Sequence, residues 1–203
     1  MPRPEHLDTP HGHCVIVEPD DLAAALAALP AAERVYAATL GEVRRREHIA
    51  GRTALHLALD EHTTPILADE RGAPILPAGW VGSVSHKGAR AVAIIAPAGA
   101  GWVGVDLEVA APPRQDIARR ILTPYEQGKL PDRGRAVTLR FAIKEAIYKA
   151  IDPVLRRYVG FTEVELDLEH HVCRVTSALP LAIEATWREH DGHWLATARA
   201  TSK

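Results

Sequence analysis

From residue 164 onward, the chain alternates between apolar and polar side chains. Four segments carry this pattern: VELDL (164–168), VCRV (172–175), LAIEATW (181–187) and WLATARA (194–200). Successive side chains of a strand point to opposite faces, so the alternation predicts strands that bury one face and expose the other. Antiparallel sheets have this property, and the end of the chain is therefore predicted to form one.

Earlier segments predict helices. Residues 20–29 (DDLAAALAAL) predict a short helix with an Asp near its start as the cap, and Pro30 ends that pattern. Residues 31–59 are rich in Ala, Leu, Arg and Glu and contain no Pro. They predict one long helix in spite of Gly41 and Gly51.

The middle of the chain mixes both kinds of element. Repeated Pro and Gly between residues 60 and 82 predict a loop with at most one short strand. Residues 89–97 and 102–109 predict two strands joined by a tight turn at AGAG. TPYE (123–126) is typical of a helix start, and LRFAIKEAIYKAI (139–151) of an amphipathic helix. Helices mixed with antiparallel strands predict an α+β fold.

The composition limits the classes of function. The chain has 203 residues, 47% hydrophobic and 25% charged, enough for one large or two small soluble domains. A net charge of −2 and 5% aromatic residues speak against a nucleic-acid partner, and no apolar run approaches the ~18 residues of a membrane span. Cys14 and Cys173 show no metal spacing, and the N-terminus lacks the apolar stretch of a secretory signal, so we expect a cytoplasmic protein.

Two acidic residues share one face of a predicted strand. Asp106 and Glu108, in GVDLE (104–108), are two positions apart. Adjacent carboxylates repel each other unless a cation lies between them, and Mg²⁺ prefers carboxylate oxygens together with water and substrate phosphates. Two solvent-facing acids on an edge strand would give the same pattern, and for this motif alone that interpretation is the simpler one.

Three charges crowd the middle of the 139–151 helix. Glu145 and Lys149 are four residues apart and share a face, and Lys144 precedes them. A surface ion pair worth at most ~0.5 kcal/mol is the plain interpretation. The functional interpretation is a third metal carboxylate beside a phosphate-binding lysine.

Two further polar groups suit a phosphate. SVSH (83–86), which we expect to form a turn before a strand, offers hydroxyl, imidazole and backbone N–H groups. Arg44, Arg45 and Arg52 on the predicted long helix and Arg71 in a turn supply guanidinium groups, which match phosphate oxygens in pairs. Each group alone is also typical of an ordinary surface. Together with the acids and lysines, they form a complete set for a phosphate-rich substrate held with one Mg²⁺.

These motifs resemble those of the 4′-phosphopantetheinyl transferases, of the type that activate siderophore, polyketide and non-ribosomal peptide synthetases. The family shows [VI]G[VI]D[IVL]E, and this chain has VGVDLE at 103–108. The family also shows [FWL]xxKE[AS]xxK, and this chain has FAIKEAIYK at 141–149. Upstream matches at GRTALHLAL (51–59) and RGAPILPAGWVGSVSH (71–86), and GF at 160–161, extend the resemblance over about residues 42–165.

The resemblance implies an activity and a site. The enzyme would move the 4′-phosphopantetheine arm of coenzyme A to a serine of an apo acyl or peptidyl carrier protein and release 3′,5′-ADP. Asp106, Glu108 and Glu145 fall on the positions that bind Mg²⁺, with Mn²⁺ as the other candidate ion. The expected catalytic residues are Glu145, Lys149 and Asp106, with Glu145 as the base. The expected coenzyme-binding residues are Arg44, Arg52, Arg71, Ser85, His86, Lys144 and Lys149.

One residue departs from the family pattern. Some members carry a basic Arg where this chain has His56, so the grip on the 3′-phosphate of the coenzyme is either looser or supplied by Arg52. The family fold implied is two similar α+β halves in a pseudo-two-fold arrangement, with the active site between them. Residues 1–100 would carry the arginines and SVSH, and residues 101–203 the metal carboxylates. We expect a monomer.

The expected partner is an acidic carrier protein. Residues 114–157 hold eleven Lys and Arg against five Asp and Glu, a basic rim that would steer such a protein. The candidates are Arg119, Arg120, Arg133, Arg135, Arg156 and Arg157. Two other interpretations are a metal-dependent nuclease, whose ExK signature the spacing of Glu145 and Lys149 does not fit, and a non-catalytic regulator that binds coenzyme A or the carrier.

Overall fold

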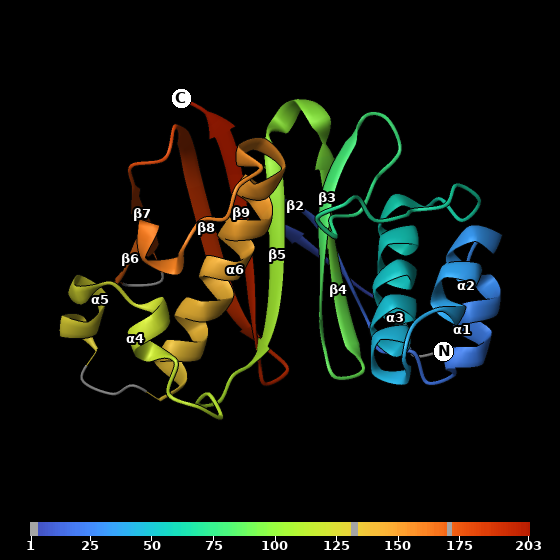
Figure 1. Cartoon of the computed structure of the whole chain (residues 1–203), viewed down its shortest axis with the longest axis horizontal. Helices are drawn as coiled ribbons and strands as arrows, with labels where there is room; N and C mark the ends of the chain where they lie inside the picture. The colour runs from blue at the N-terminus through green and yellow to red at the C-terminus, as the bar shows by residue number, and fades with distance from the viewer. Residues whose placement is uncertain (1–3, 131–133, 170–171) are drawn as a thin grey trace. The chain divides into compact units, whose positions relative to one another are not determined.

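A four-stranded antiparallel sheet covered by a long helix forms the first part of the computed structural model, which describes residues 4–130, 134–169 and 172–203 (Figure 1). Alpha-carbon contacts divide the chain into two units, Met1–Ala100 (unit 1) and Gly101–Lys203 (unit 2). Both units combine helices with antiparallel strands, which confirms the predicted α+β class.

Unit 1 is built around the helix α3 (Glu42–Leu59). This helix packs on the sheet through the small side chains of Ala50 and Ala54, which meet Val15, Ala91 and Ala93 in a buried apolar cluster. The strands lie in the order β1-β2-β4-β3. The other elements of unit 1 are β1 (Glu5–Thr9), β2 (Gly12–Val17), α1 (Leu22–Ala28), α2 (Ala31–Ala38), β3 (Trp80–Lys87), β4 (Arg90–Pro97) and the single turn η1 (Ala98–Ala100).

Three predictions for unit 1 need correction. The helix predicted over 31–59 is two helices, because the chain is extended at Gly41 (ψ 158°), which caps α3. SVSH (83–86) lies inside the strand β3 rather than in a turn before a strand. The predicted hairpin across AGAG does not form, because β4 pairs with β2 and β3. The helix predicted over 20–29 is confirmed as α1, with the Asp21 carboxylate accepting hydrogen bonds from the first turn.

Unit 2 is built around α6 (Arg135–Leu155), which packs on a three-stranded sheet of order β5-β9-β8. A second sheet pairs β6 with β7. All four strands predicted from the alternating pattern are confirmed. The other elements of unit 2 are β5 (Trp102–Val109), α4 (Ala118–Ile121), α5 (Pro124–Lys129), η2 (Phe161–Glu163), β6 (Val164–Glu169), β7 (Val172–Ser177), β8 (Leu181–His190) and β9 (His193–Ser202).

A glycine lets the backbone of α6 rest directly on β5. A Cβ atom placed on Gly104 would overlap the carbonyl oxygen of Ala146 and would lie 2.7 Å from the backbone nitrogen of Ala150. Real Cβ atoms do not approach backbone atoms so closely, so position 104 requires glycine as long as α6 keeps its place. This close approach fixes the distance between the strand that carries the predicted acids and the helix that carries Glu145 and Lys149.

Candidate active site

The predicted acids of unit 2 come from two elements. Asp106 and Glu108 lie on β5, and Glu145 and Lys149 lie one turn apart on α6. Asp106 is buried, whereas Glu108 and Glu145 are partly exposed. Since α6 rests on β5 at Gly104, the strand and the helix bring their charged side chains into one neighbourhood.

Lys149 joins the strand to the helix. Its ammonium donates hydrogen bonds to Asp106 Oδ1 at 2.8 Å and to the carbonyl oxygen of Val105 at 2.9 Å. A quarter of the Lys149 side chain remains exposed, and the ammonium has a third donor beyond its bonds to Asp106 and Val105. Lys149 can therefore hold Asp106 and still meet a phosphate oxygen from the solvent side.

The pKa of the Glu145 carboxyl is raised above its ordinary value. Burial raises the pKa of its carboxyl, the negative charges of Asp106 and Glu108 raise it further, and the ammonium of Lys149 opposes them. Three carboxylates that influence one another in this way are a donor set suited to a hard divalent cation. By this test, the residues of unit 2 fit Mg²⁺ or Mn²⁺.

The three carboxylates are too far apart to share one ion as they stand. Within the residues that the structure describes, ligand atoms of Asp106, Glu108 and Glu145 do not all lie within 4.8 Å of one another. Carboxylates without a cation between them repel each other, and Asp106 Oδ1 already pairs with Lys149. Their joint coordination of one ion remains a prediction.

Lys144 does not take part in this group. The residue is only 3% exposed, and its ammonium donates to Glu126 Oε2 (2.7 Å), to the carbonyl oxygen of Ile121 (2.7 Å) and to that of Phe161 (3.0 Å). These contacts contradict the prediction that Lys144 binds the coenzyme, because all three donors of the ammonium are used inside the protein. Lys144 instead anchors α6 to the segment around α5.

Glu126 completes this anchor. It is the third residue of α5, where Thr123 and Glu126 form the capping box that TPYE predicts. Glu126 Oε2 accepts the backbone N–H of Thr123 at 2.6 Å, and Oε1 accepts that of Leu166 at 3.1 Å. A residue predicted as a helix cap is therefore also the buried counter-charge of Lys144.

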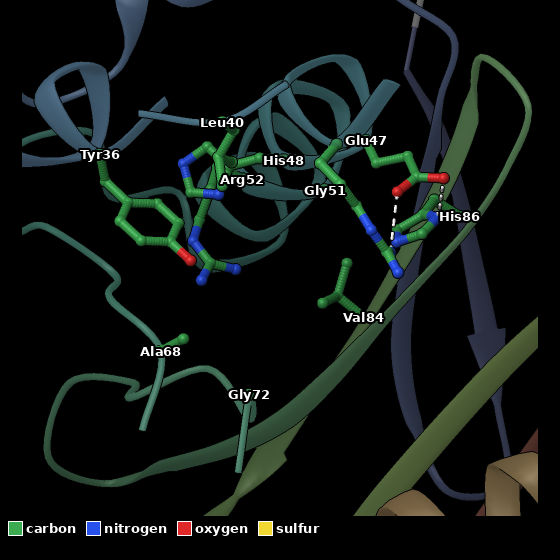
Figure 2. Close-up of a pocket in the computed structure, with 11 residues that line it drawn as sticks. Tyr36, Leu40, Glu47, His48, Gly51, Arg52, Ala68, Gly72, Val84 and His86 are labelled. Carbon is green, nitrogen blue, oxygen red and sulfur yellow. Dashed lines mark hydrogen bonds and ion pairs between the residues drawn. The ribbon is translucent and has the colours of Figure 1, made fainter. Parts of the chain in front are cut away.

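Unit 1 holds a separate pocket of about 360 Å³ between α2, α3, β3 and the loop before β3 (Figure 2). Among the residues that line this pocket, Arg52 contributes a buried guanidinium. The residue is only 6% exposed, and the guanidinium points toward Tyr36 (Figure 2). Among the described residues, Arg52 Nε has no hydrogen-bond partner and no carboxylate comes within ion-pair distance of the guanidinium. A buried arginine without a paired anion is suited to bind one from outside.

Glu47 contacts two other residues that line this pocket. Its carboxylate lies 3.0 Å from a guanidinium nitrogen of Arg44 and 3.4 Å from His86 Nδ1. Arg44 is largely exposed, so its charge also faces solvent. The structure therefore gathers three of the predicted coenzyme-binding residues, Arg44, Arg52 and His86, around one pocket.

Two other predicted residues do not line the pocket. Ser85 is buried and neighbours His86 on β3, so its side chain points to the opposite face of the strand. The side chain of Arg71 is exposed, and the pocket is lined by its neighbour Gly72. The structure therefore does not bring the Ser85 and Arg71 side chains to this pocket, and their binding of the coenzyme stays a prediction.

His56 is excluded from the pocket by its own contacts. It is 3% exposed and lies between Glu33 and the carbonyl oxygen of Glu61. It is not among the residues that line the pocket.

Sequence reasoning missed Tyr36 and His48. Both line the pocket, and their rings meet edge to face with centroids 5.1 Å apart. Burial lowers the pKa of His48, and the neighbouring positive charge of Arg52 lowers it further. The spacing of His48 and Arg52, four residues apart on one helix, was the signal available in the sequence.

Comparisons with known proteins complete the description. The family model described as "4'-phosphopantetheinyl transferase N-terminal domain" matches residues 32–96, and the model described as "4'-phosphopantetheinyl transferase superfamily" matches residues 102–199. The chain is 37% identical over 151 residues to 4′-phosphopantetheinyl transferase Npt of Nocardia iowensis, covering 71% of this chain and 68% of Npt. It is 34% identical over 135 residues to enterobactin synthase component D of Escherichia coli O157:H7, covering 62% and 63% respectively.

Solved structures give a partial match. The holo-[acyl-carrier-protein] synthase of Thermotoga maritima aligns with a TM-score of 0.41 and 26% identity, covering 50% of this chain and 64% of that protein. Across the described ranges of the chain, no helix combines the length and the apolar character that a membrane crossing requires.

Proposed function

The chain belongs to the 4′-phosphopantetheinyl transferase family, and from this premise we propose how its residues carry out the reaction. An enzyme of this family moves the 4′-phosphopantetheine arm of coenzyme A to a carrier protein. The alternative of a non-catalytic regulator has no support in the comparisons. The observation that carries the proposal is the 2.8 Å contact between Lys149 on α6 and Asp106 on β5. Glu145 on the same helix has a carboxyl pKa that burial and the charge of Asp106 raise.

In this proposal, the serine hydroxyl of the carrier attacks the β-phosphorus of coenzyme A. An O–P bond forms to the serine, and the bond between that phosphorus and the bridging oxygen breaks, so that 3′,5′-ADP leaves. Glu145 accepts the serine proton, because burial and its acidic neighbours raise the pKa of this carboxyl. Lys149 donates to a phosphate oxygen and so stabilises the negative charge that develops there.

Asp106, Glu108 and Glu145 would hold a divalent ion, which neutralises charge on the diphosphate when bound. In unit 1, Arg52 and Arg44 would bind the phosphate groups at the nucleotide end of the coenzyme, with His86 beside them. That both sets of residues act on one coenzyme molecule is part of the proposal and follows from the resemblance.

A mass-spectrometric assay tests the proposal. The protein is incubated with an apo carrier protein, coenzyme A and Mg²⁺, and the carrier should gain the mass of one phosphopantetheine group. EDTA should abolish the gain, and Mn²⁺ should restore it. E145Q, which removes the charge but not the shape, should lower kcat at least about 100-fold while the protein stays folded. A full rate with E145Q or in EDTA would contradict the assigned roles.

We infer that fewer arginines serve the carrier-binding rim than the sequence predicts. Arg135 pairs with Glu189 at 2.6 Å, and Arg157 pairs with Glu163 at 2.8 Å. Arg133 lies outside the described residues. Arg119 and Arg120 on α4 are exposed and form no ion pair within the described part of the chain.

We therefore propose that Arg119 and Arg120 provide the positive charge that attracts an acidic carrier protein. The charge reversal R119E/R120E should raise KM for the carrier about tenfold at low salt, leave kcat nearly unchanged and remove most of the salt dependence of KM. The matched reversal R135E, at an arginine already paired, should change KM much less. Equal effects of the two variants would contradict this rim.

The resemblance also suggests where the enzyme works. We propose that it acts as a cytoplasmic monomer on carriers of secondary-metabolite synthetases. Sedimentation of the purified protein should give the mass of a single chain of 22.1 kDa. A stable dimer at micromolar concentration would contradict the monomer.

A further inference from the structure

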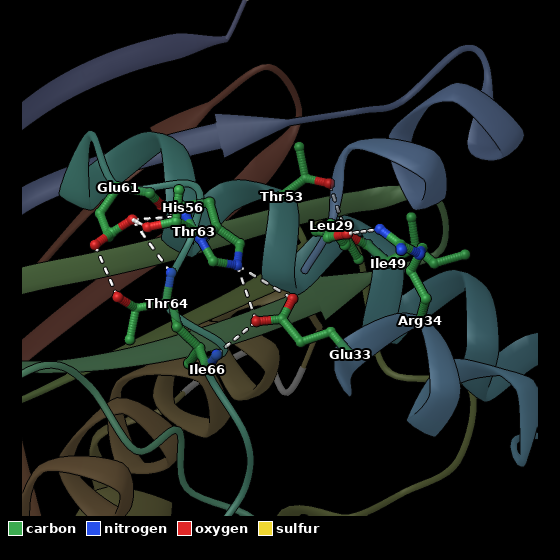
Figure 3. A network of polar contacts seen from close by, with 10 residues as sticks. All are labelled: Leu29, Glu33, Arg34, Ile49, Thr53, His56, Glu61, Thr63, Thr64 and Ile66. Carbon is green, nitrogen blue, oxygen red and sulfur yellow. Dashed lines mark hydrogen bonds and ion pairs between the residues drawn. The ribbon is translucent and has the colours of Figure 1, made fainter. Parts of the chain in front are cut away.

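A fully buried carboxylate lies on α2 of unit 1. Glu33 on α2 is fully buried, and its Oε1 atom accepts the backbone N–H of Ile66 at 2.5 Å (Figure 3). The same carboxylate accepts His56 Nε2, at 2.9 Å to Oε1 and 3.1 Å to Oε2. Nothing in the proposed reaction uses Glu33, although a buried charge of this kind destabilises a fold unless it is paired.

His56 pairs with Glu33 as a cation. Its other ring nitrogen, Nδ1, lies 2.5 Å from the carbonyl oxygen of Glu61 (Figure 3). The carbonyl oxygen of Glu61 can only accept, and so can the Glu33 carboxylate when it is ionised, so with Glu33 ionised both ring nitrogens of His56 donate. An imidazole that donates from both nitrogens carries a positive charge, and Glu33 and His56 therefore form a buried ion pair.

Arg52 lies within the electrostatic reach of this pair. The charge of Glu33 acts on the guanidinium of Arg52, and Arg52 in turn acts on His56. Yet the guanidinium of Arg52 points into the pocket (Figure 2). Among the described residues, it forms no ion pair with Glu33. The positive charges of His56 and Arg52 therefore both act on the buried carboxylate of Glu33, and of the two only His56 forms hydrogen bonds with it in the described part of the chain.

We propose that His56 is a positioning residue, which occupies the carboxylate of Glu33 and so keeps the guanidinium of Arg52 unpaired for an anionic group of the coenzyme. The proposal rests on the proposed function, in which the pocket of unit 1 binds phosphate groups of coenzyme A. Without the charge of His56, Glu33 would be a buried anion whose neighbouring cation is Arg52. The guanidinium would then turn from the pocket toward Glu33, because an unpaired buried carboxylate is strongly unfavourable.

Two neutral variants separate this role from a merely structural one. H56Q keeps a hydrogen-bond donor but removes the positive charge, so Glu33 should capture Arg52 and KM for coenzyme A should rise about tenfold or more, with kcat at saturation nearly unchanged. E33Q removes the competing carboxylate, so Arg52 should stay in the pocket and KM should stay within about threefold of the original. Both variants lose the same buried ion pair, so thermal stability should fall in both.

The double variant E33Q/H56Q makes the test strict. It contains neither charge, so KM for coenzyme A and binding of 3′,5′-ADP, measured by calorimetry, should return close to the original values. A KM that rises equally in H56Q, E33Q and the double variant would mean that the pair only supports the fold, and would overturn the proposal. Should H56Q fail to fold, weak 3′,5′-ADP binding by the folded double variant would overturn it as well.

R52Q distinguishes this inference from the proposed function. R52Q should raise KM for coenzyme A at least as much as H56Q does. An unchanged KM in R52Q would overturn the pocket assignment and this inference with it, whereas an unchanged KM in H56Q alone would overturn only the role of His56. A crystal structure of H56Q should show the guanidinium of Arg52 at ion-pair distance from Glu33.

Discussion

We predict that G104A separates α6 from β5 and thereby pulls Lys149 away from Asp106. The added methyl group would overlap the carbonyl oxygen of Ala146 and would lie 2.7 Å from the nitrogen of Ala150. Both obstacles are backbone atoms in the middle of a helix of 21 residues, so no side-chain rotation relieves the clash. The helix itself has to move.

The size of the movement follows from the contacts. Bringing even the contact with the nitrogen of Ala150 to an ordinary 3.4 Å requires a shift of at least about 0.7 Å, and the overlap with the oxygen requires more. Overpacking of this kind costs about 1–3 kcal/mol of stability. Catalysis is more sensitive, because a misplacement of about 1 Å in an active site can cost 100-fold in rate.

The assay measures kcat for transfer to the carrier and the midpoint of urea unfolding. G104A should lower kcat about 100-fold and stability by about 2 kcal/mol. G128A is the matched control in the same unit, because a Cβ at Gly128 meets nothing within 4 Å; it should keep the rate and leave stability equal or slightly higher. A normal kcat in a folded G104A protein would refute the idea that this glycine sets the spacing of the site.

Other predictions concern the buried polar groups. K144M should destabilise the protein by about 3 kcal/mol in urea unfolding, because it leaves Glu126 buried without its cation, and K144M/E126Q should recover part of this loss; an unchanged midpoint in K144M would contradict the anchoring role. His56 should make stability depend on pH: burial alone lowers the pKa of His56, but its bonds to Glu33 and Glu61 outweigh burial and raise that pKa. The stability contributed by protonated His56 is therefore complete below about pH 6.5 and is lost as the pH rises through the raised pKa. Urea midpoints between about pH 6 and 9 should show this loss, and H56Q should lack it.

The predictable parts of the fold are those governed by local pattern. The strands β6 to β9 follow from the alternation of apolar and polar residues, although β9 is buried at four successive positions, 195–198. The helix α5 follows from the capping box at Thr123. The break between α2 and α3 was missed because one glycine is a weak signal against 29 residues without proline. The serines of SVSH favour a turn, because serine is common in turns, yet pairing with β4 makes the segment a strand.

The site residues likewise divide into those that local motifs predict and those that only tertiary contacts bring together. The positions of Asp106, Glu145 and Lys149 follow from two short motifs, whose elements then meet through packing at Gly104. The true partner of Lys144 could not be predicted, because Glu126 lies 18 residues upstream and is itself predicted as a cap. The Glu33–His56 pair spans 23 residues and two helices, so it appears only once the chain has folded.

The order β1-β2-β4-β3 bears on how this protein can be shortened. The family model for the N-terminal domain starts at residue 32, after β1 and β2, yet β2 is an interior strand bonded to both β1 and β4. A chain cut to the start of that match would lose β2 and leave the polar backbone groups of β4 uncovered along a line of apolar residues from Ala91 to Ala96. Such an edge invites pairing between molecules, so trimmed versions should aggregate even though every residue of the matched segment is kept.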